Sequence, residues 1–151
     1  TVEECLRKHP PGTTTTRLCT KDVEIGGHTD NCPPIKIEAG TPVVLPMYSL
    51  HNDPYHFPDP ERFDPERFSE ENKEKRHPYA HFPFGAGPRS CPGFRFALSM
   101  VKMSIISILL DFKVTLRDGK PPEKIELNPM NTFFHTPKNG LWIKFDKLRQ
   151  N

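Results

Sequence analysis

The first third of the chain contains short segments with recognisable polar and apolar patterns. Residues 2–8 are typical of the end of a helix, because the prolines of HPP at 9–11 remove amide donors and favour extended backbone. β-Branched, roughly alternating residues over 13–25 predict a strand. Residues 41–50 predict a second strand that runs into a short helix, and the turn-forming residues 26–34 lie between the two strands.

The clearest element is a helix over residues 94–112, which is apolar around nearly its whole circumference. Arg95, Ser99 and Lys102 make one narrow polar stripe, and a few other polar residues fall on nearly the opposite side. Such a helix is normally buried among other helices, and this chain does not supply them. Farther on, residues 124–145 predict two short strands around a turn. One face of the second strand is expected to carry Leu141, Ile143 and Phe145.

Residues 53–93 are punctuated by prolines and show little periodicity. A stretch of this length without regular structure is uncommon in a compact domain unless it serves a site. It contains the tandem repeat DPERFDPERF at 59–68, whose simplest interpretation is two consecutive turns with Phe63 and Phe68 directed inward. The whole chain agrees with much irregular structure, because 18 of its 151 residues are proline and only 34% are hydrophobic.

Charge and cysteine content limit the classes of function. The net charge of +2 predicts neither nucleic-acid binding nor strong attraction to a membrane surface. The four cysteines form no CxxC pair, which argues against a zinc ribbon, and their spacing does not suggest a disulfide framework. Cys5, Cys19 and Cys32 are expected to be small buried hydrophobes. The start of the chain shows no signal peptide or membrane anchor and no methionine, so we expect a piece of a longer protein.

Cys91 lies in a different setting, within FPFGAGPRSCPGFRFA at 82–97. Glycines on both sides permit close backbone approach, and the predicted helix begins just after the cysteine, which favours thiolate over thiol. A catalytic nucleophile needs a general base, and none of the seven histidines is nominated by its position. The loop lacks the phosphate-binding glycine pattern, and iron–sulfur ligation would require more cysteines nearby. Cys91 therefore remains an activated thiolate whose role these residues leave open.

The pattern formed by Phe84, Gly87, Arg89, Cys91 and Gly93 resembles the haem-binding signature of the cytochrome P450 family. Two further motifs occur in the family's order: ECLR resembles the ExxR motif, and the second DPERF resembles the meander motif. The resemblance implies a mainly α fold with small β-sheets, the cytochrome P450 fold. Residues 1–151 would be its C-terminal haem-binding portion, from the ExxR helix through the meander, the cysteine loop and the long helix to a C-terminal β-hairpin. The animal microsomal branch is most similar, particularly arthropod enzymes that metabolise foreign compounds.

The resemblance also implies roles for individual residues. Cys91 would be the axial ligand of haem b iron and the catalytic residue. Other residues at the cofactor would be Arg89, Arg17, Phe84, Gly85, Gly87, Gly93 and Ala97. A buried structural triad would consist of Glu4, Arg7 and Arg67, with the first ERF, at 61–63, as the second candidate for the meander role. The substrate pocket would include Thr13, Thr14, Asn131, Thr132 and Phe133.

By the same resemblance, the protein would be a monooxygenase that inserts one atom of dioxygen into a small lipophilic substrate. Its electrons would derive from NADPH through NADPH–cytochrome P450 reductase, with cytochrome b5 as a second possible donor, and no nucleic acid would be involved. Arg89, Arg95, Lys102 and the charged run at 72–76 would form the docking surface. The parent protein would face the cytosol from the endoplasmic reticulum membrane, held by an N-terminal anchor that this sequence lacks. Two alternatives stay open: a haem-thiolate peroxygenase or isomerase, and a partial haem-binding segment that is inactive alone.

Overall fold

The computed structural model describes residues 1–26, 33–117, 119, 125–128 and 136–148. Its α-helices are α1 (Val2–Lys8), α2 (Met47–His51), α3 (Glu70–Lys75) and α4 (Phe94–Asp111), and its 3-10 helices are η1 (Pro65–Phe68) and η2 (Gly87–Arg89). The strands are β1 (Thr15–Leu18), β2 (Val23–Ile25), β3 (Ile35–Ile37), β4 (Pro42–Leu45), β5 (Phe112–Leu116) and β6 (Ile143–Lys147). This mixture of helices with small antiparallel sheets agrees with the fold class that the resemblance implies.

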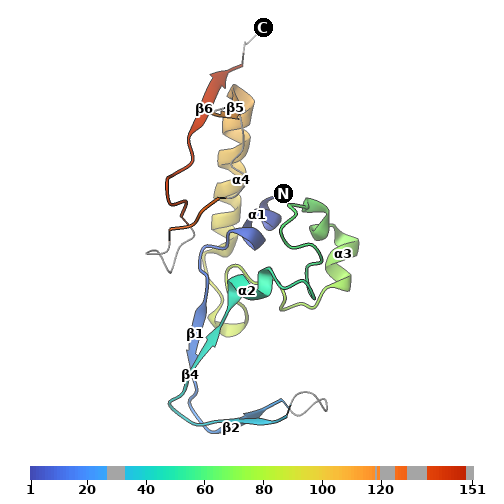
Figure 1. Ribbon diagram of the computed structural model, residues 1–151, viewed down its shortest axis with the longest axis vertical. Helices are drawn as coiled ribbons and strands as arrows, with labels where there is room; N and C mark the ends of the chain where they lie inside the picture. The colour runs from blue at the N-terminus through green and yellow to red at the C-terminus, as the bar shows by residue number, and fades with distance from the viewer. Residues whose placement is uncertain (27–32, 118, 120–124, 129–135, 149–151) are drawn as a thin grey trace.

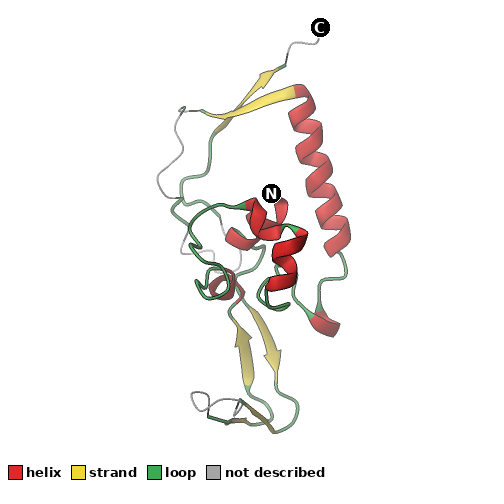
Figure 2. Cartoon of the chain, turned by 90° about the vertical axis from the view of Figure 1, so that its right-hand side faces the viewer, coloured by secondary structure: helices red, strands yellow, loops and turns green. Residues whose placement is uncertain are grey.

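The short helices α1, α2 and α3 gather at the middle of the molecule, while α4 lies to one side (Figures 1 and 2). The small apolar core beneath these helices is made by Phe57, Phe68 and Ala80, which are between 1% and 7% exposed. The rings of Phe57 and Phe68 stack with centroids 6.5 Å apart. Arg76 lies over both rings, with its guanidinium carbon 5.4 Å from the Phe57 centroid and 4.5 Å from that of Phe68.

The strands pair in three separate two-stranded antiparallel sheets, β1 with β4, β2 with β3, and β5 with β6. The single strand predicted over 13–25 is therefore wrong, because the chain leaves the first sheet after Leu18 and starts a second hairpin at Val23. The β2–β3 hairpin lies at the far end of the β1–β4 ribbon in Figure 1. β6 pairs with β5, which follows α4 directly, and an isolated bridge joins Leu127 to Pro137 within the described residues.

The proline-rich region is ordered by local hydrogen bonds. The Asp64 side chain accepts from the Glu66 amide and caps η1, and Ser69 caps α3 by accepting from the Asn72 amide. Phe68 is buried as expected, but Phe63 is 47% exposed. The two copies of DPERF are thus not equivalent: only the second forms a 3-10 helix that packs its phenylalanine into the core.

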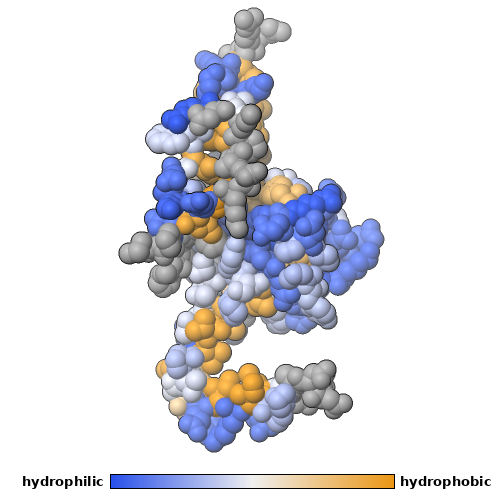
Figure 3. All heavy atoms as spheres, viewed as in Figure 1, coloured by the Kyte–Doolittle hydropathy of each residue, from blue (hydrophilic) through white to orange (hydrophobic). Residues whose placement is uncertain are grey.

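Helix α4 is exposed along its length within the part of the chain described. Phe96 and Leu110 are each 72% exposed, and Met103 is 63% exposed. The space-filling view shows apolar side chains gathered along this helix (Figure 3). In the described residues, no helix is both long and apolar enough to cross a bilayer.

Candidate functional site

Cys91 lies on an exposed turn between η2 and α4. Its amide donates to the carbonyl of Phe84 at 2.8 Å, and the Gly85 amide donates to the carbonyl of Phe82 at 2.8 Å. Gly85 and Gly87 have φ values of 77° and 74°, which favour glycine because a side chain is strained there. These hydrogen bonds fold the segment into a turn, so that the backbone of Cys91 lies beside that of Phe84.

The surroundings leave the Cys91 sulfur accessible. Cys91 is a free thiol and is exposed. A Cβ added at Gly93 would lie 3.9 Å from the sulfur, so glycine keeps this side of it uncovered. Phe84 and Phe94 flank the turn with ring centroids 6.5 Å apart, and α4 begins at Phe94 with Gly93 as its N-cap. The expected neighbours of the ligand are therefore brought together here, with Ala97 one turn into the helix.

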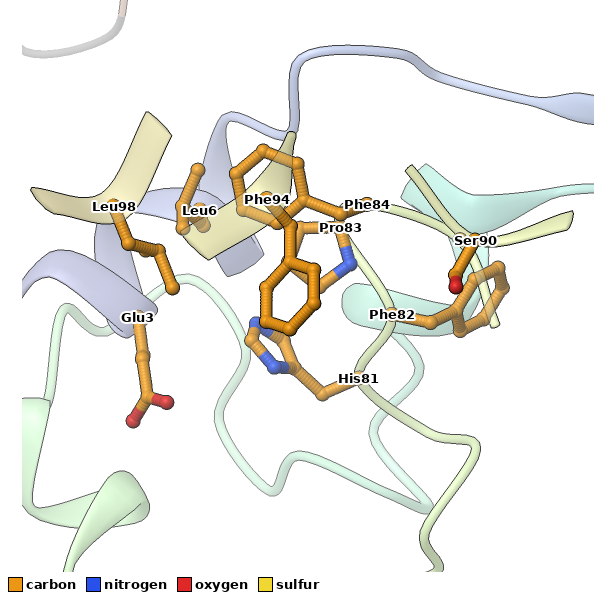
Figure 4. A pocket seen from close by; sticks show the side chains of 10 residues that line it. Glu3, Leu6, His81, Phe82, Pro83, Phe84, Ser90, Phe94 and Leu98 are labelled. Atoms are coloured by element: carbon orange, nitrogen blue, oxygen red, sulfur yellow. The ribbon is translucent and has the colours of Figure 1, made fainter. Parts of the chain in front are cut away.

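A cavity of about 320 Å³ lies between α1, the segment before the cysteine and the first turns of α4. Leu6, His81, Phe84, Phe94 and Leu98 contribute to its wall (Figure 4). The cavity is lined mainly by apolar surface, and Cys91 is not among its lining residues. It separates α4 from α1 and shows that the two helices are not packed tightly together at this end.

Glu4 and Arg7 form a fully buried ion pair, with both residues 0% exposed. Arg7 Nε donates to Glu4 Oε2 at 2.7 Å, and Arg7 Nη2 donates to Oε1 at 2.9 Å. The remaining donors of the guanidinium bind the carbonyls of His51 and Pro60 and the side chain of Asn52. All five N–H groups of Arg7 are thereby satisfied, which is the condition for burying such a charge without a large penalty.

Arg67 lies at the edge of this pair. Its Nε is 3.7 Å from Glu4 Oε1, longer than a hydrogen bond, and its Nη2 donates to the Asp59 carbonyl at 2.7 Å. The amide of Asp64 donates to Glu4 Oε1 at 3.0 Å. The second DPERF copy thus meets Glu4 directly, whereas Glu61 of the first copy contacts Lys8 at the surface.

Two histidines that the sequence pattern did not indicate lie in this region. His51 is 0% exposed, and its Nε2 accepts from the Phe82 amide at 3.0 Å. His81 lies beside it, with ring centroids 5.0 Å apart. Burial is the main cause that lowers the pKa of His51 to about 4 and that of His81 to about 3. His51 precedes the proline-punctuated region 53–93 and His81 lies within it, 30 residues later, and neither position indicated a contact.

Of the two arginines expected at the carboxylates of a cofactor, Arg17 is half-buried and Arg89 is exposed. Arg17 in β1 donates from Nη1 to Thr15 Oγ1 and to the Thr16 carbonyl, both at 2.9 Å, and Arg89 is exposed in η2. Among the described residues, no acid forms an ion pair with either arginine.

Two of the residues expected at the substrate pocket are described. Thr13 accepts from the Tyr48 amide through its carbonyl, and Thr14 is exposed. The other pocket residues, Asn131, Thr132 and Phe133, lie outside the described residues.

The charged run at 72–76 is largely used within the chain. Lys75 pairs with Glu71 at 2.6 Å, Lys73 pairs with Glu70 and Glu3, and Arg76 is stacked on the aromatic core. Arg95 and Lys102 remain exposed on α4.

The expectation for the other cysteines is corrected: Cys5 is exposed, because it is on the face of α1 turned away from Glu4 and Arg7, and Cys19 is half-buried. Cys32 lies outside the described residues.

Comparison with known proteins identifies relatives along the whole chain. The family model for cytochrome P450 matches residues 1–143. Cytochrome P450 4V2 of Rattus norvegicus is 38% identical over 150 residues, which are 99% of this chain and 26% of that protein. Cytochrome P450 9e2 of Blattella germanica is 38% identical over 147 residues, covering 97% of this chain and 26% of the relative. Cytochrome P450 3A16 of Mus musculus is 48% identical over 111 residues, covering 74% of this chain and 21% of the relative.

The chain thus spans about a quarter of the length of the rat and cockroach relatives. These relatives are mammalian and insect proteins, which supports a cytochrome P450 of animal type and does not distinguish arthropod from mammalian members. The matched region includes the buried Glu4–Arg7 pair, the second DPERF copy and the cysteine turn. The chain belongs to the cytochrome P450 family.

Proposed function

We propose that this chain is the C-terminal haem-binding portion of a monooxygenase, with Cys91 as the ligand of the haem iron. The observation that carries the proposal is the exposed free thiol of Cys91, held on a glycine-rich turn at the start of an apolar helix. Membership of the family implies haem as the cofactor. Haem held by a cysteine thiolate supplies an iron centre suited to cleaving the O–O bond.

The residues around Cys91 fit a flat, largely apolar group with a thiolate ligand. The sulfur is uncovered on the side of Gly93, and Phe94 and Phe96 at the start of α4 are 37% and 72% exposed. Burying this apolar surface against a macrocycle would be favourable. Arg89 and Arg17 make no ion pairs with acids in the described residues, so their guanidinium groups are available for the two haem propionates.

The substrate, partners and location follow as parts of the same proposal. Thr13 and Thr14, with residues 131–133, would contribute to a pocket for a lipophilic substrate. Arg89, Arg95 and Lys102 would receive an acidic flavoprotein reductase or cytochrome b5, because exposed positive charge steers such partners. NADPH would act only through the reductase. Family membership also supports a place on the cytosolic face of the endoplasmic reticulum membrane for the full-length protein.

The test is the spectrum of the full-length protein after reduction under carbon monoxide, compared with its Cys91→Ser variant. We expect a thiolate-type Soret band in the parent and its loss in the variant. Survival of that band in Cys91→Ser would overturn the assignment. The exposed Cys5→Ser variant is the matched control and should keep the band.

One relative, thromboxane-A synthase of Mus musculus, is 39% identical over 143 residues and is named as a synthase. The second candidate is the haem-thiolate peroxygenase or isomerase that the resemblance left open. Turnover with a reductase and NADPH but not with peroxide would support the monooxygenase. Turnover with peroxide alone would support the second candidate.

A further inference from the structure

His51 makes hydrogen bonds to two parts of the molecule, which also meet through the core contacts of Ala80 and His81 with Phe68. It ends helix α2 and is 0% exposed. Its carbonyl accepts from Arg7 Nη1 at 2.8 Å, while its imidazole Nε2 accepts from the Phe82 amide at 3.0 Å. One residue therefore binds the buried ion pair through its main chain and the start of the cysteine segment through its side chain.

Phe82 is connected to Cys91 by a short segment that is held by backbone hydrogen bonds. Phe82 is buried, and its ring meets the His51 ring edge-on with centroids 5.5 Å apart. The Phe82 carbonyl accepts from Gly85, and the Phe84 carbonyl accepts from Cys91, each at 2.8 Å. A shift of the Phe82 amide would therefore pass through a short, hydrogen-bonded turn to the backbone of the cysteine.

The imidazole of His51 must be neutral at Nε2 to accept this bond, and its surroundings favour that form. Burial lowers its pKa to about 4, and the charges of Arg7 and Arg76 act in the same direction. The groups that face it are Arg7 from α1, Arg76 after α3 and the His81 ring 5.0 Å away. The backbone groups of Arg7 and Leu6 act in the opposite direction and raise the pKa, but burial has the larger effect.

We propose that His51 is a positioning residue: its neutral imidazole anchors the Phe82 amide and so ties the turn that carries Cys91 to the buried Glu4–Arg7 pair. The proposal rests on the function proposed above, because its consequence is the placement of the haem ligand. It does not depend on what else covers the chain, because His51 and Phe82 are already buried within it. Protonation at Nε2 would replace the acceptor by a donor facing the Phe82 amide and release the turn.

Two substitutions distinguish loss of the hydrogen-bond acceptor at position 51 from loss of its ionisable group. In His51→Gln the side-chain oxygen can accept from Phe82 but does not titrate, whereas His51→Leu removes the acceptor. The control is His56→Gln, on the same segment and outside these hydrogen bonds. The first readout is hydrogen exchange of the Phe82 amide in the full-length protein. We expect about tenfold faster exchange in His51→Leu, the factor that one ordinary buried hydrogen bond provides, and near-normal exchange in His51→Gln and the control.

The second readout is the acid titration of the thiolate-type band in the reduced carbon monoxide complex. We expect His51→Leu to lose much of the band at neutral pH. His51→Gln should keep the band and lose it only at lower pH than the parent. Unchanged Phe82 exchange in His51→Leu, or identical acid titrations of His51→Gln and the parent, would overturn the proposal.

The same spectra separate this proposal from the function on which it rests. If Cys91→Ser keeps the band, the proposed function fails and the positioning role fails with it. If Cys91→Ser loses the band but His51→Leu retains it with normal Phe82 exchange, only the positioning role fails. Should His51→Leu not fold, the acid titration of His51→Gln alone decides, because that variant retains an acceptor.

Discussion

The buried centre around Glu4 and Arg7 and the helix α4 reverse the usual distribution of polar and apolar residues. In the first region two charged side chains are 0% exposed. In the second, apolar side chains such as Phe96 and Leu110 are 72% exposed. Both regions belong to one chain, and they lie on either side of the cavity lined by Leu6 and Leu98.

The difference lies in where each region finds its partners. The charges of Glu4 and Arg7 are satisfied within the chain, by each other, by the His51 and Pro60 carbonyls and by the Asp64 amide. The apolar surface of α4 has no comparable cover among the described residues. Buried polar groups need specific partners, whereas apolar surface is stabilised by any close-packed cover. The polar centre is therefore complete within this chain, whereas α4 retains apolar surface that is not covered by the described residues.

The strongest test of this contrast is Arg7→Ala. It leaves the Glu4 carboxylate buried without its main partner and also removes the donor that the His51 and Pro60 carbonyls share. Breaking a buried, hydrogen-bonded ion pair costs about 3–5 kcal/mol. We expect a loss of that size in the free energy of unfolding, measured by denaturant titration followed by circular dichroism. The control is Lys75→Ala at the exposed pair with Glu71, where little change is expected. Equal stability of the two variants would contradict the contrast.

A second test uses pH. The folded-state pKa values of His51 and His81, about 4 and about 3, lie below the ordinary value of 6.5. The unfolded chain therefore binds more protons in this range, so stability is fully present above pH 6.5 and falls as the pH approaches 4. Denaturant midpoints measured across this range should decrease as the pH is lowered from 6.5 to 4.

The double variant His51→Gln/His81→Gln should lose much of that dependence between pH 6.5 and 4. The exposed His77→Gln should behave like the parent protein. A decrease of the same size in the double variant would show that groups other than these two histidines cause it.

The smallest expected effect is that of Leu110→Gln in α4. In this 151-residue chain the side chain is 72% exposed, so the free energy of unfolding should change by no more than about 0.5 kcal/mol. The reference is Phe57→Ala in the core, expected to cost about 3–5 kcal/mol. In the full-length protein Leu110→Gln should cost much more than in this chain. A large effect in this chain would mean that α4 is already covered here.

Much of the site could be predicted because it is local in sequence. The cysteine turn depends on glycines and prolines within about ten residues, and α4 on a continuous apolar run, so both follow from short-range pattern. The division of 13–25 into two strands could not be predicted, because β-propensity does not say which partner strand each residue meets. The same reason applies to the pairing of β6 with β5.

The sequence by itself determined the family, the order of its motifs and the identity of Cys91 as the candidate ligand, because these are carried by residue types at short spacing. Only the tertiary structure decided that the second DPERF copy and not the first meets Glu4, and that Phe68 is buried while Phe63 is exposed. It also placed His51 against Phe82, 31 residues away. Such contacts depend on how distant segments fold against each other, and a buried imidazole and an exposed one have the same letter in the sequence.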